Sequence, residues 1–416
     1  MIVERVGKCE VVCSNTLEYL KTMKDESVDM IITSPPYYAL RKYPDDCVIE
    51  WGDGTKCQLG LEPTPDLYVK HLSMIIKELY RVLKKEGVFF LNIGDTYSND
   101  KFNTDVPRKG LLAIPERVLL ECMKTGFIRR NTIIWHKPNS LPIPFKDRLA
   151  NTFEYVYVLV KNKKYYFNLD AIREQYDEKT IERIKTFIKN NEKFSKERHK
   201  YDESGFSQAP SKVRENAVKS FVKFNYNRLE LKYGEMYTVN EKEISEYEER
   251  PKCRKFNFEK NTVRLPPSFS NEKYLEKKFN DINFDEIYDL RLKNPGDVWT
   301  LTTEPFKENH FAIFPRKLVA RCIACACPEN GTILDPFFGS GTVGVVSELF
   351  NTRQFDKIPK FDEICNPNVV KKMDWNIKCI GIEIVKQYFE MSVKRIKKEV
   401  YESTKPLSEW WCEWLN

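Results

Sequence analysis

A proline-rich loop follows a predicted buried strand near the start of the chain. The strand covers residues 28–32, and Ser34, Pro35, Pro36 and Tyr37 come shortly after it. Two prolines fix φ and remove two backbone donors, so the loop presents carbonyl oxygens, a hydroxyl group and an aromatic ring. These groups match a flat ring with an exocyclic amine, which would donate to Ser34 and the Pro35 carbonyl while Tyr37 stacks on the ring. Such acceptors would draw the amine hydrogens out of the ring plane and make the nitrogen nucleophilic.

A glycine turn between a predicted strand and a predicted helix is the second candidate site. It follows Asp335 and contains Gly339-x-Gly341-x-x-Gly344, formally a dinucleotide-binding pattern. A helix N-terminus with glycine backbone can hold a pyrophosphate or a carboxylate. Asp335 matches a cationic amino group, and Glu383, at the end of the next predicted strand, matches ribose hydroxyls. Together these groups indicate S-adenosylmethionine. NAD is the alternative, although its ribose carboxylate is expected ~20 residues beyond the turn.

Both loops need a parallel sheet to position them. Residues 1–175 alternate short apolar runs with helical stretches, which predicts the βα pattern of a parallel sheet, and residues 295–416 repeat that pattern. Charged and amide residues dominate 176–294, which we interpret as an inserted module, with a solvated insertion as the alternative. Predicted strands cover 28–32, 88–93, 131–135, 154–160, 331–335 and 378–384, and predicted helices cover 67–83, 318–327, 343–349 and 388–400.

Composition limits the class of protein. The 416 residues include 68 Lys and Arg against 61 Asp and Glu, which favours a local basic cleft over a uniformly positive surface. A hydrophobic fraction of 41% excludes a disordered chain. No apolar run approaches the ~18 residues of a membrane helix, and the first residues do not resemble a signal peptide. We therefore expect a cytoplasmic protein whose 12 cysteines are reduced.

Three cysteines have a spacing that resembles a metal site. Cys322-x-x-Cys325-x-Cys327 lies on a predicted helix, and no second cysteine pair follows at zinc spacing. The pattern favours buried structural thiols, so no metal centre is expected.

Taken together, the two loops resemble the hallmarks of the amino-group DNA methyltransferases, which methylate N4 of cytosine or N6 of adenine. The catalytic loop is Ser-Pro-Pro-Tyr, and the cofactor loop is Asp-Pro-Phe-x-Gly-Ser-Gly-Thr. The catalytic loop comes first, which is similar to the permuted β arrangement of the family. The resemblance covers residues 1–175 and 294–400. It implies an α/β fold: a Rossmann-like S-adenosylmethionine-dependent methyltransferase sheet with an inserted target-recognition region. Residues 1–175 would be the catalytic half, 176–294 the inserted region and 295–416 the cofactor-binding half.

The resemblance also implies roles for individual residues. Asn15 stands where the family usually has an aspartate that contacts the cofactor adenine. In the family's corresponding segment, Phe311 would stack on the cofactor and Pro315 would shape its methionine end. The remaining implied cofactor contacts are Asp335, Phe337, Gly339, Ser340, Gly341, Thr342 and Glu383. The implied target-base pocket is formed by Tyr38, Asp95, Trp135 and Lys137.

The expected function is site-specific methylation of cytosine N4 in double-stranded DNA, by base flipping and direct displacement. Ser-Pro-Pro-Tyr leans towards cytosine within the family, and adenine N6 stays open. Methylation at cytosine C5 is excluded because the chain has no Pro-Cys dipeptide for its nucleophile. Methylation of RNA or of a protein amide, an NAD-dependent reaction and a catalytically dead DNA-binding role also stay open. So do a cognate restriction endonuclease as partner and the oligomeric state.

Overall fold

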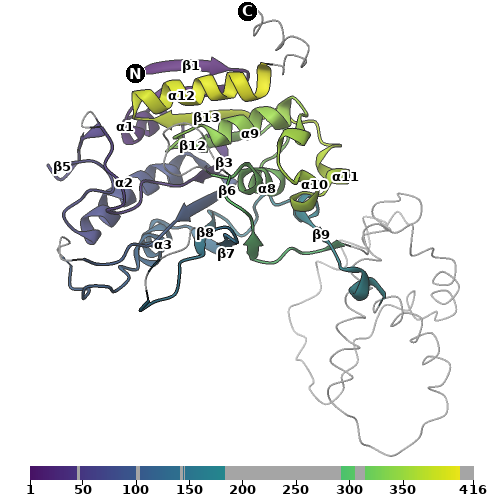
Figure 1. Cartoon of the computed structure of the whole chain (residues 1–416). Helices are drawn as coiled ribbons and strands as arrows, with labels where there is room; N and C mark the ends of the chain where they lie inside the picture. Colours follow the sequence, from purple (N-terminus) through teal and green to yellow (C-terminus); the bar gives the residue numbers. More distant parts are fainter. Residues whose placement is uncertain are drawn as a thin grey trace, which may run out of the picture. The chain divides into compact units, whose positions relative to one another are not determined.

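A computed structural model of the chain describes residues 1–44, 47–99, 104–140, 144, 146–182, 292–304 and 314–402. The chain divides into two units, and Figure 1 shows the helices and strands of the first. The first comprises residues 1–174 and 294–416, and the second comprises 175–293. Strands β9 (Glu174–Gln175) and β10 (Leu292–Lys293) pair where the chain leaves and re-enters the first unit.

The first unit is built on a large mixed sheet. Within the described residues, nine strands follow the order β1-β2-β13-β12-β3-β6-β8-β7-β11. The five from β2 to β6 in this order are parallel to one another. The bounds are β1 Ile2–Val6, β2 Cys9–Cys13, β3 Val28–Thr33, β6 Leu83–Ile93, β7 Ile128–His136, β8 Phe153–Val160, β11 Val298–Thr300, β12 Thr332–Asp335 and β13 Lys378–Glu383. A small separate sheet pairs β4 (Ile49–Glu50) with β5 (Lys56–Cys57).

The six predicted strands are all present, and β3 and β6 are parallel as predicted for residues 1–175, but other strands in that range are antiparallel. Strand β8 runs antiparallel to both β6 and β7, and β1 runs antiparallel to β2. The physical reason for these antiparallel pairs lies in the segments that connect the strands. Neither the turn from β1 to β2 nor the described part of the link from β7 to β8 contains a crossover helix, which parallel neighbours require.

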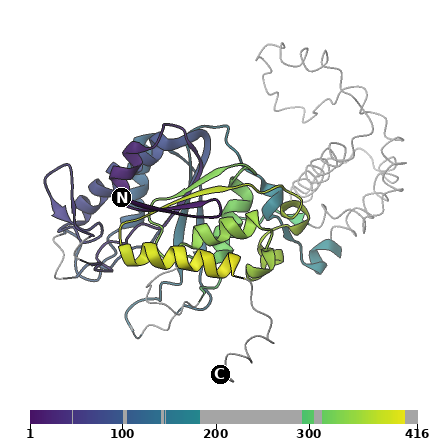
Figure 2. The same ribbon diagram turned by 90° about the horizontal axis from the view of Figure 1, so that it is seen from above.

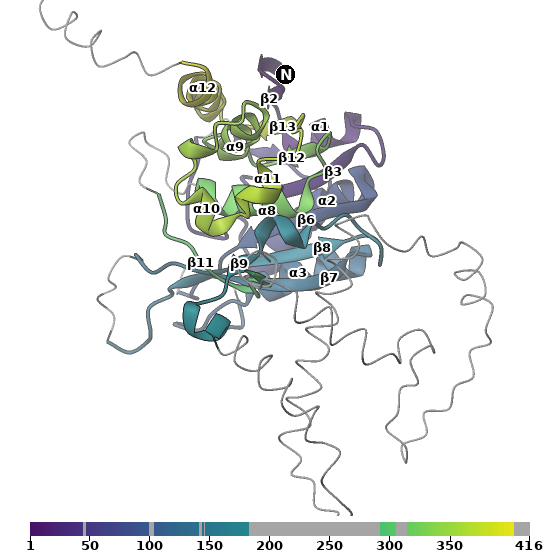
Figure 3. The ribbon, with the colours of Figure 1, turned by 90° about the vertical axis from the view of Figure 1, so that its right-hand side faces the viewer.

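Helices cover both faces of the sheet, as Figures 2 and 3 show. Ile31 and Phe89 face one helical layer, and their neighbours Met30 and Phe90 face the other, as the two-residue period of a strand demands. The first layer contains α1 (Thr16–Thr22), α2 (Pro65–Val82) and α3 (Ile114–Thr125). The second contains α8 (Arg316–Ala326), α9 (Thr342–Asn351), α12 (Lys386–Ile396) and the short helices α10 (Phe361–Ile364) and α11 (Pro367–Val370). None of the described helices is long and apolar enough to cross a membrane.

The cysteines of α8 are part of the core. Cys322, Cys325 and Cys327 have no exposed surface, and burial raises the pKa of Cys325 to about 12. The prediction that these thiols are buried is confirmed.

The strand order creates a switch point between β12 and β3. From β12 the chain crosses through α9 to β13 on one side, and from β3 it crosses through α2 to β6 on the other. In open α/β sheets, ligands bind in the crevice where neighbouring strands send their connections in opposite directions. The two candidate loops follow β12 and β3, so the topology brings them together there.

Candidate active site

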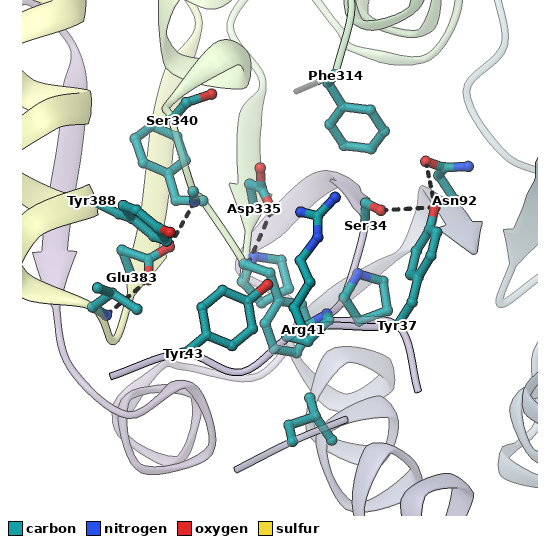
Figure 4. Close-up of a pocket in the computed structure, with 18 of the residues that line it drawn as sticks. Ser34, Tyr37, Arg41, Tyr43, Asn92, Phe314, Asp335, Ser340, Glu383 and Tyr388 are labelled. Carbon is teal, nitrogen blue, oxygen red and sulfur yellow. Dashed lines mark hydrogen bonds between the residues drawn. The ribbon is translucent and has the colours of Figure 1, made fainter. Parts of the chain in front are cut away.

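A cavity of about 540 Å³ lies at the carboxyl ends of β3, β12 and β13 (Figure 4). Both predicted loops contribute to its wall although they come from opposite ends of the sequence. The predicted site residues that line it are Ser34, Pro35, Pro36, Tyr37, Trp135, Lys137, Asp335, Phe337, Gly339, Ser340, Thr342 and Glu383.

The catalytic loop is held by a directional chain of hydrogen bonds. Ser34 Oγ donates to the Tyr37 hydroxyl (3.2 Å), which donates to Glu154 Oε2 (2.8 Å). Asn92 Nδ2 donates to the same carboxylate oxygen at 3.0 Å, and Asn92 Oδ1 lies 3.2 Å from the Tyr37 hydroxyl. Because Ser34 gives its hydrogen to Tyr37, the lone pairs of its oxygen stay available to a donor in the cavity.

An ion pair completes this end of the cavity. Lys137 Nζ pairs with Glu154 Oε1, and the ammonium group lies 4.4 Å from the centre of the Trp135 ring. The Trp135 indole is fixed by its own hydrogen bond to the Leu301 carbonyl (2.8 Å). Burial, and then the charge of Glu154, hold the pKa of Tyr37 well above its usual range, so its hydroxyl remains a donor.

Two buried carboxyl groups mark the other end. Asp335 accepts from Thr33 Oγ1 (2.6 Å), Glu383 accepts from the Gly339 N–H (2.7 Å), and each accepts from the backbone N–H two residues further along (3.1 and 2.8 Å). Burial raises the pKa of each carboxyl group to about 7. These groups are only partly satisfied by the protein, as expected for residues that accept from a ligand in the cavity.

The glycine turn is braced from α12. Gly341 has φ +77°, a conformation that glycine adopts without strain, and α9 begins at the next residue. The Arg395 guanidinium donates to Ser340 Oγ (3.0 Å), Thr342 Oγ1 (3.0 Å) and the Ser340 carbonyl (3.1 Å). The turn is therefore fixed before any ligand arrives.

Five of the predicted site residues that the structure describes lie outside the cavity wall: Asn15, Tyr38, Asp95, Pro315 and Gly341 of the glycine turn. Asn15 caps α1, where its Oδ1 accepts from the Leu17 N–H (2.9 Å), and lines a neighbouring recess. Asp95 caps α3 by accepting from the Ala113 and Ile114 N–H groups (both 3.0 Å). Pro315 precedes α8 and is buried.

Tyr38 belongs to the core. It is 1% exposed, and its ring lies 5.6 Å from that of Tyr68. The side chain after Tyr37 points into the α2 layer, so Tyr38 does not line the cavity. Phe311 lies outside the described residues.

Several lining residues were not predicted from the sequence. Phe314 comes from the same segment as Phe311, and Glu154 was seen only as the first residue of a strand. Its alternation with Val156 and Val158, both buried, would have placed its carboxyl group on the site face of the sheet. The other unpredicted lining residues include Arg41, Tyr43, Asn92, Thr303, Glu304 and Tyr388.

The fold and the cavity fit S-adenosylmethionine. Figure 4 shows Glu383, Asp335 and Ser34 around one space, so a ligand's ribose, amino group and reacting end could be held in sequence. Carboxylates at the ends of two adjacent strands, with a glycine turn between them, define a nucleotide-binding site of the Rossmann type.

The chain belongs to the DNA methylase family, whose profile matches residues 28–394. This family comprises S-adenosylmethionine-dependent amino-methyltransferases, and the chain is accordingly a DNA methyltransferase that uses this methyl donor. Family membership excludes the NAD-dependent reaction.

The similar proteins include type II methyltransferases. The type II methyltransferase M.SfiI of Streptomyces fimbriatus is 34% identical over 80% of this chain and 84% of its own. The type II methyltransferase M.SmaI of Serratia marcescens is 23% identical over 93% of this chain and 90% of its own. The solved PvuII DNA methyltransferase, described as cytosine-N4-specific, is 14% identical with a TM-score of 0.47, covering 97% of this chain and 90% of that one.

Proposed function

We propose that this enzyme methylates the exocyclic N4 amine of cytosine at a specific site in duplex DNA. The observation that carries the proposal is the serine at position 34, with its hydroxyl hydrogen directed away from the cavity. The target base leaves the helical stack, because its amine is out of reach within the duplex. Residues 176–294 would read the sequence around it.

The catalytic end would orient the amine and accept its proton. The amine donates to Ser34 Oγ and the Pro35 carbonyl, and the base stacks on Tyr37. S-adenosylmethionine would supply an electrophilic methyl group, and its sulfur would keep the electron pair of the broken S–CH3 bond. When the nitrogen gains this methyl group it loses one proton, and the hydrogen bonds from Ser34 through Tyr37 lead that proton to Glu154. Most of the acceleration comes from proximity and orientation.

The cofactor end would bind through the paired carboxyl groups. Asp335 faces the amino group of the methionine moiety, and Glu383 accepts from the ribose hydroxyls. The glycine turn lies against the part of the cofactor between these two groups. Phe314, which lines the cavity just before α8 begins, offers an apolar surface for the cofactor. We further propose that a cognate restriction endonuclease accompanies the enzyme without forming a stable complex with it, a proposal supported by the type II names of the relatives.

The test identifies the methylated nucleoside. The purified protein is incubated with unmethylated DNA and S-adenosylmethionine, and the DNA is digested and analysed by mass spectrometry. N4-methylcytosine is the expected product, whereas N6-methyladenine would overturn the choice of base and keep the chemistry.

Two variants test the catalytic end. Ser34→Ala should lose methylation by at least ~100-fold while cofactor affinity stays near the wild-type value, because Ser34 meets the amine rather than the cofactor. Glu154→Gln should lower kcat by roughly 10- to 100-fold with little change in the KM for DNA. If Ser34→Ala kept full activity, the assigned pocket would be wrong.

A further inference from the structure

A group of potential metal ligands lies behind the catalytic loop, away from the reacting groups. We call Cys57, Glu62 and His71 the hairpin cluster. Cys57 ends β5, Glu62 lies in the loop before α2, and His71 is within α2. Their sulfur, oxygen and nitrogen atoms all lie within 4.8 Å of one another. His71 has no exposed surface, Glu62 is 4% exposed, and Cys57 is half-buried.

The donor atoms are spaced almost as a bound cation would hold them. Cys57 Sγ lies 4.0 Å from His71 Nδ1, and Glu62 Oε1 lies 3.0 Å from the same nitrogen. Ligand atoms bound at about 2.0–2.3 Å to tetrahedral zinc lie roughly 3.3–3.6 Å apart. The two distances at His71 Nδ1 lie on either side of this range, and small movements of the side chains would bring the three donor atoms around one ion. A thiolate, an imidazole and a carboxylate are together the donors that Zn²⁺ prefers.

The surroundings of His71 favour the same interpretation. Its second nitrogen, Nε2, lies 3.4 Å from Asp53 Oδ1, and Lys70 pairs with Asp53 at 2.7 Å. Zinc-bound histidines usually donate their other N–H to a carboxylate, which fixes the tautomer and leaves the first nitrogen for the metal. The Trp51 ring stacks on the imidazole at 4.2 Å and fixes its plane.

The hairpin cluster is linked to the catalytic loop through the backbone. Glu62 Oε2 accepts from the Gly60 N–H (2.8 Å), and the Gly60 carbonyl accepts from the Ala39 N–H (2.7 Å). On the α2 side, the Tyr68 hydroxyl donates to the Pro36 carbonyl (2.9 Å). An ion bound by Cys57, Glu62 and His71 would connect β5, the loop before α2 and α2 itself. That loop and α2 make the hydrogen bonds to the catalytic loop described above.

We propose that the hairpin cluster binds one Zn²⁺ through Cys57, Glu62 and His71, and that this ion holds the catalytic loop in position. The proposal departs from the sequence-based expectation of no metal centre, because a single cysteine with distant glutamate and histidine ligands lacks the paired-cysteine signature. The ion takes no part in methyl transfer, so the proposal is independent of which base is methylated.

The first experiment measures zinc in the full-length protein. Protein is incubated with a molar excess of Zn²⁺, separated from free metal in the presence of a chelator of known affinity, and analysed by elemental mass spectrometry. We expect one zinc per wild-type chain and at least tenfold weaker binding in Cys57→Ser and His71→Gln. Asp53→Asn should weaken binding on the order of tenfold. Cys47→Ser is the matched control, because it removes a nearby cysteine outside the hairpin cluster and should keep the zinc.

A second measurement uses the wild-type protein, in case a variant does not fold. Co²⁺ bound to a cysteine thiolate gives a charge-transfer band in the near ultraviolet, and added Zn²⁺ should abolish it. Zn²⁺ should also raise the Tm of the metal-free protein, since an ion that binds only the folded state stabilises it. Absence of both zinc and the cobalt band would overturn the proposal. Zinc retained equally by wild type, Cys57→Ser and His71→Gln would overturn it too, since the ion would then lie elsewhere.

Discussion

Asp335 is a carboxyl group whose protonation depends on whether the cavity is filled. It is 2% exposed, and among the described residues it accepts hydrogen bonds from one hydroxyl and one backbone N–H. Burial raises its pKa to about 7, so in the cofactor-free enzyme it is partly protonated near neutral pH. A cationic ligand group beside it would favour the ionised form.

The pH dependence of the free energy of unfolding should report the raised pKa of Asp335. A carboxyl group that binds its proton more tightly in the folded state than in the unfolded chain, where its pKa is about 3.9, favours folding at low pH. This contribution is lost as the pH rises through about 7. Asp335→Asn removes the titration, so above pH 7 the cofactor-free variant should be more stable than wild type, by roughly 1–4 kcal/mol at about 1.4 kcal/mol per pKa unit.

Urea unfolding of the cofactor-free protein at a series of pH values measures this difference. Asp105→Asn, which removes an exposed carboxyl group, controls for net charge. The same Asp335→Asn variant should bind S-adenosylmethionine at least tenfold more weakly in calorimetry. Parallel pH profiles for wild type and Asp335→Asn would show that another group is responsible.

At the scale of elements, the end of β6 decides where the catalytic ring lies. A Cβ atom added at Gly94, directly after this strand, would come within 2.6 Å of Tyr37 Cε2. The absence of a side chain at Gly94 therefore allows the Tyr37 ring to lie against the backbone with its hydroxyl at Glu154.

Gly94→Ala should displace the Tyr37 ring and lower kcat by roughly 10- to 100-fold, because misplacement of a positioning group by about 1 Å can reduce the rate ~100-fold. Cofactor affinity, set at the other end of the cavity, should change less than threefold. Gly52→Ala is the matched control, since a Cβ there meets nothing within 4 Å. Methylation rates at saturating cofactor measure the effect, and an unchanged rate in Gly94→Ala would mean that the ring position is not critical.

The elements themselves were largely predictable from the sequence, because apolar runs and helical spacing are local signals. Strands β3, β12 and β13 and the loops after them follow from such signals, and they supplied Ser34, Tyr37, Asp335 and Glu383. The alternation of β8 places the Glu154 side chain on the site face, but its hydrogen bond to Tyr37, 117 residues away, could not be predicted in this way. The antiparallel direction of β8 could not be predicted either, because it depends on a connection whose described part contains no helix. Contacts between distant segments carry no periodic pattern.

At the scale of the whole molecule, the paired strands β9 and β10 mark the boundary between the region proposed to recognise DNA and the region proposed to transfer the methyl group. Because their ends are adjacent, a short Gly/Ser linker can replace residues 178–290 without stretching the chain. The shortened protein should keep its fold and bind S-adenosylmethionine within about threefold of wild type, as measured by calorimetry. Its methylation of DNA should fall by at least ~100-fold, because the phosphate and base contacts would be lost. Equal site-specific methylation by the shortened protein would locate recognition elsewhere.

The position of β12 and β13 between β2 and β3 has a consequence for synthesis in the cell. A ribosome produces β2 and β3 early, but the strands that fill the gap between them emerge only when residues 332–383 have been made. Until then the nascent chain exposes two unpaired strand edges and contains neither Asp335 nor Glu383, which we propose to contact the cofactor. We expect no methylation activity from a product that terminates before β12, because the gap between β2 and β3 is filled only after β13 has been synthesised.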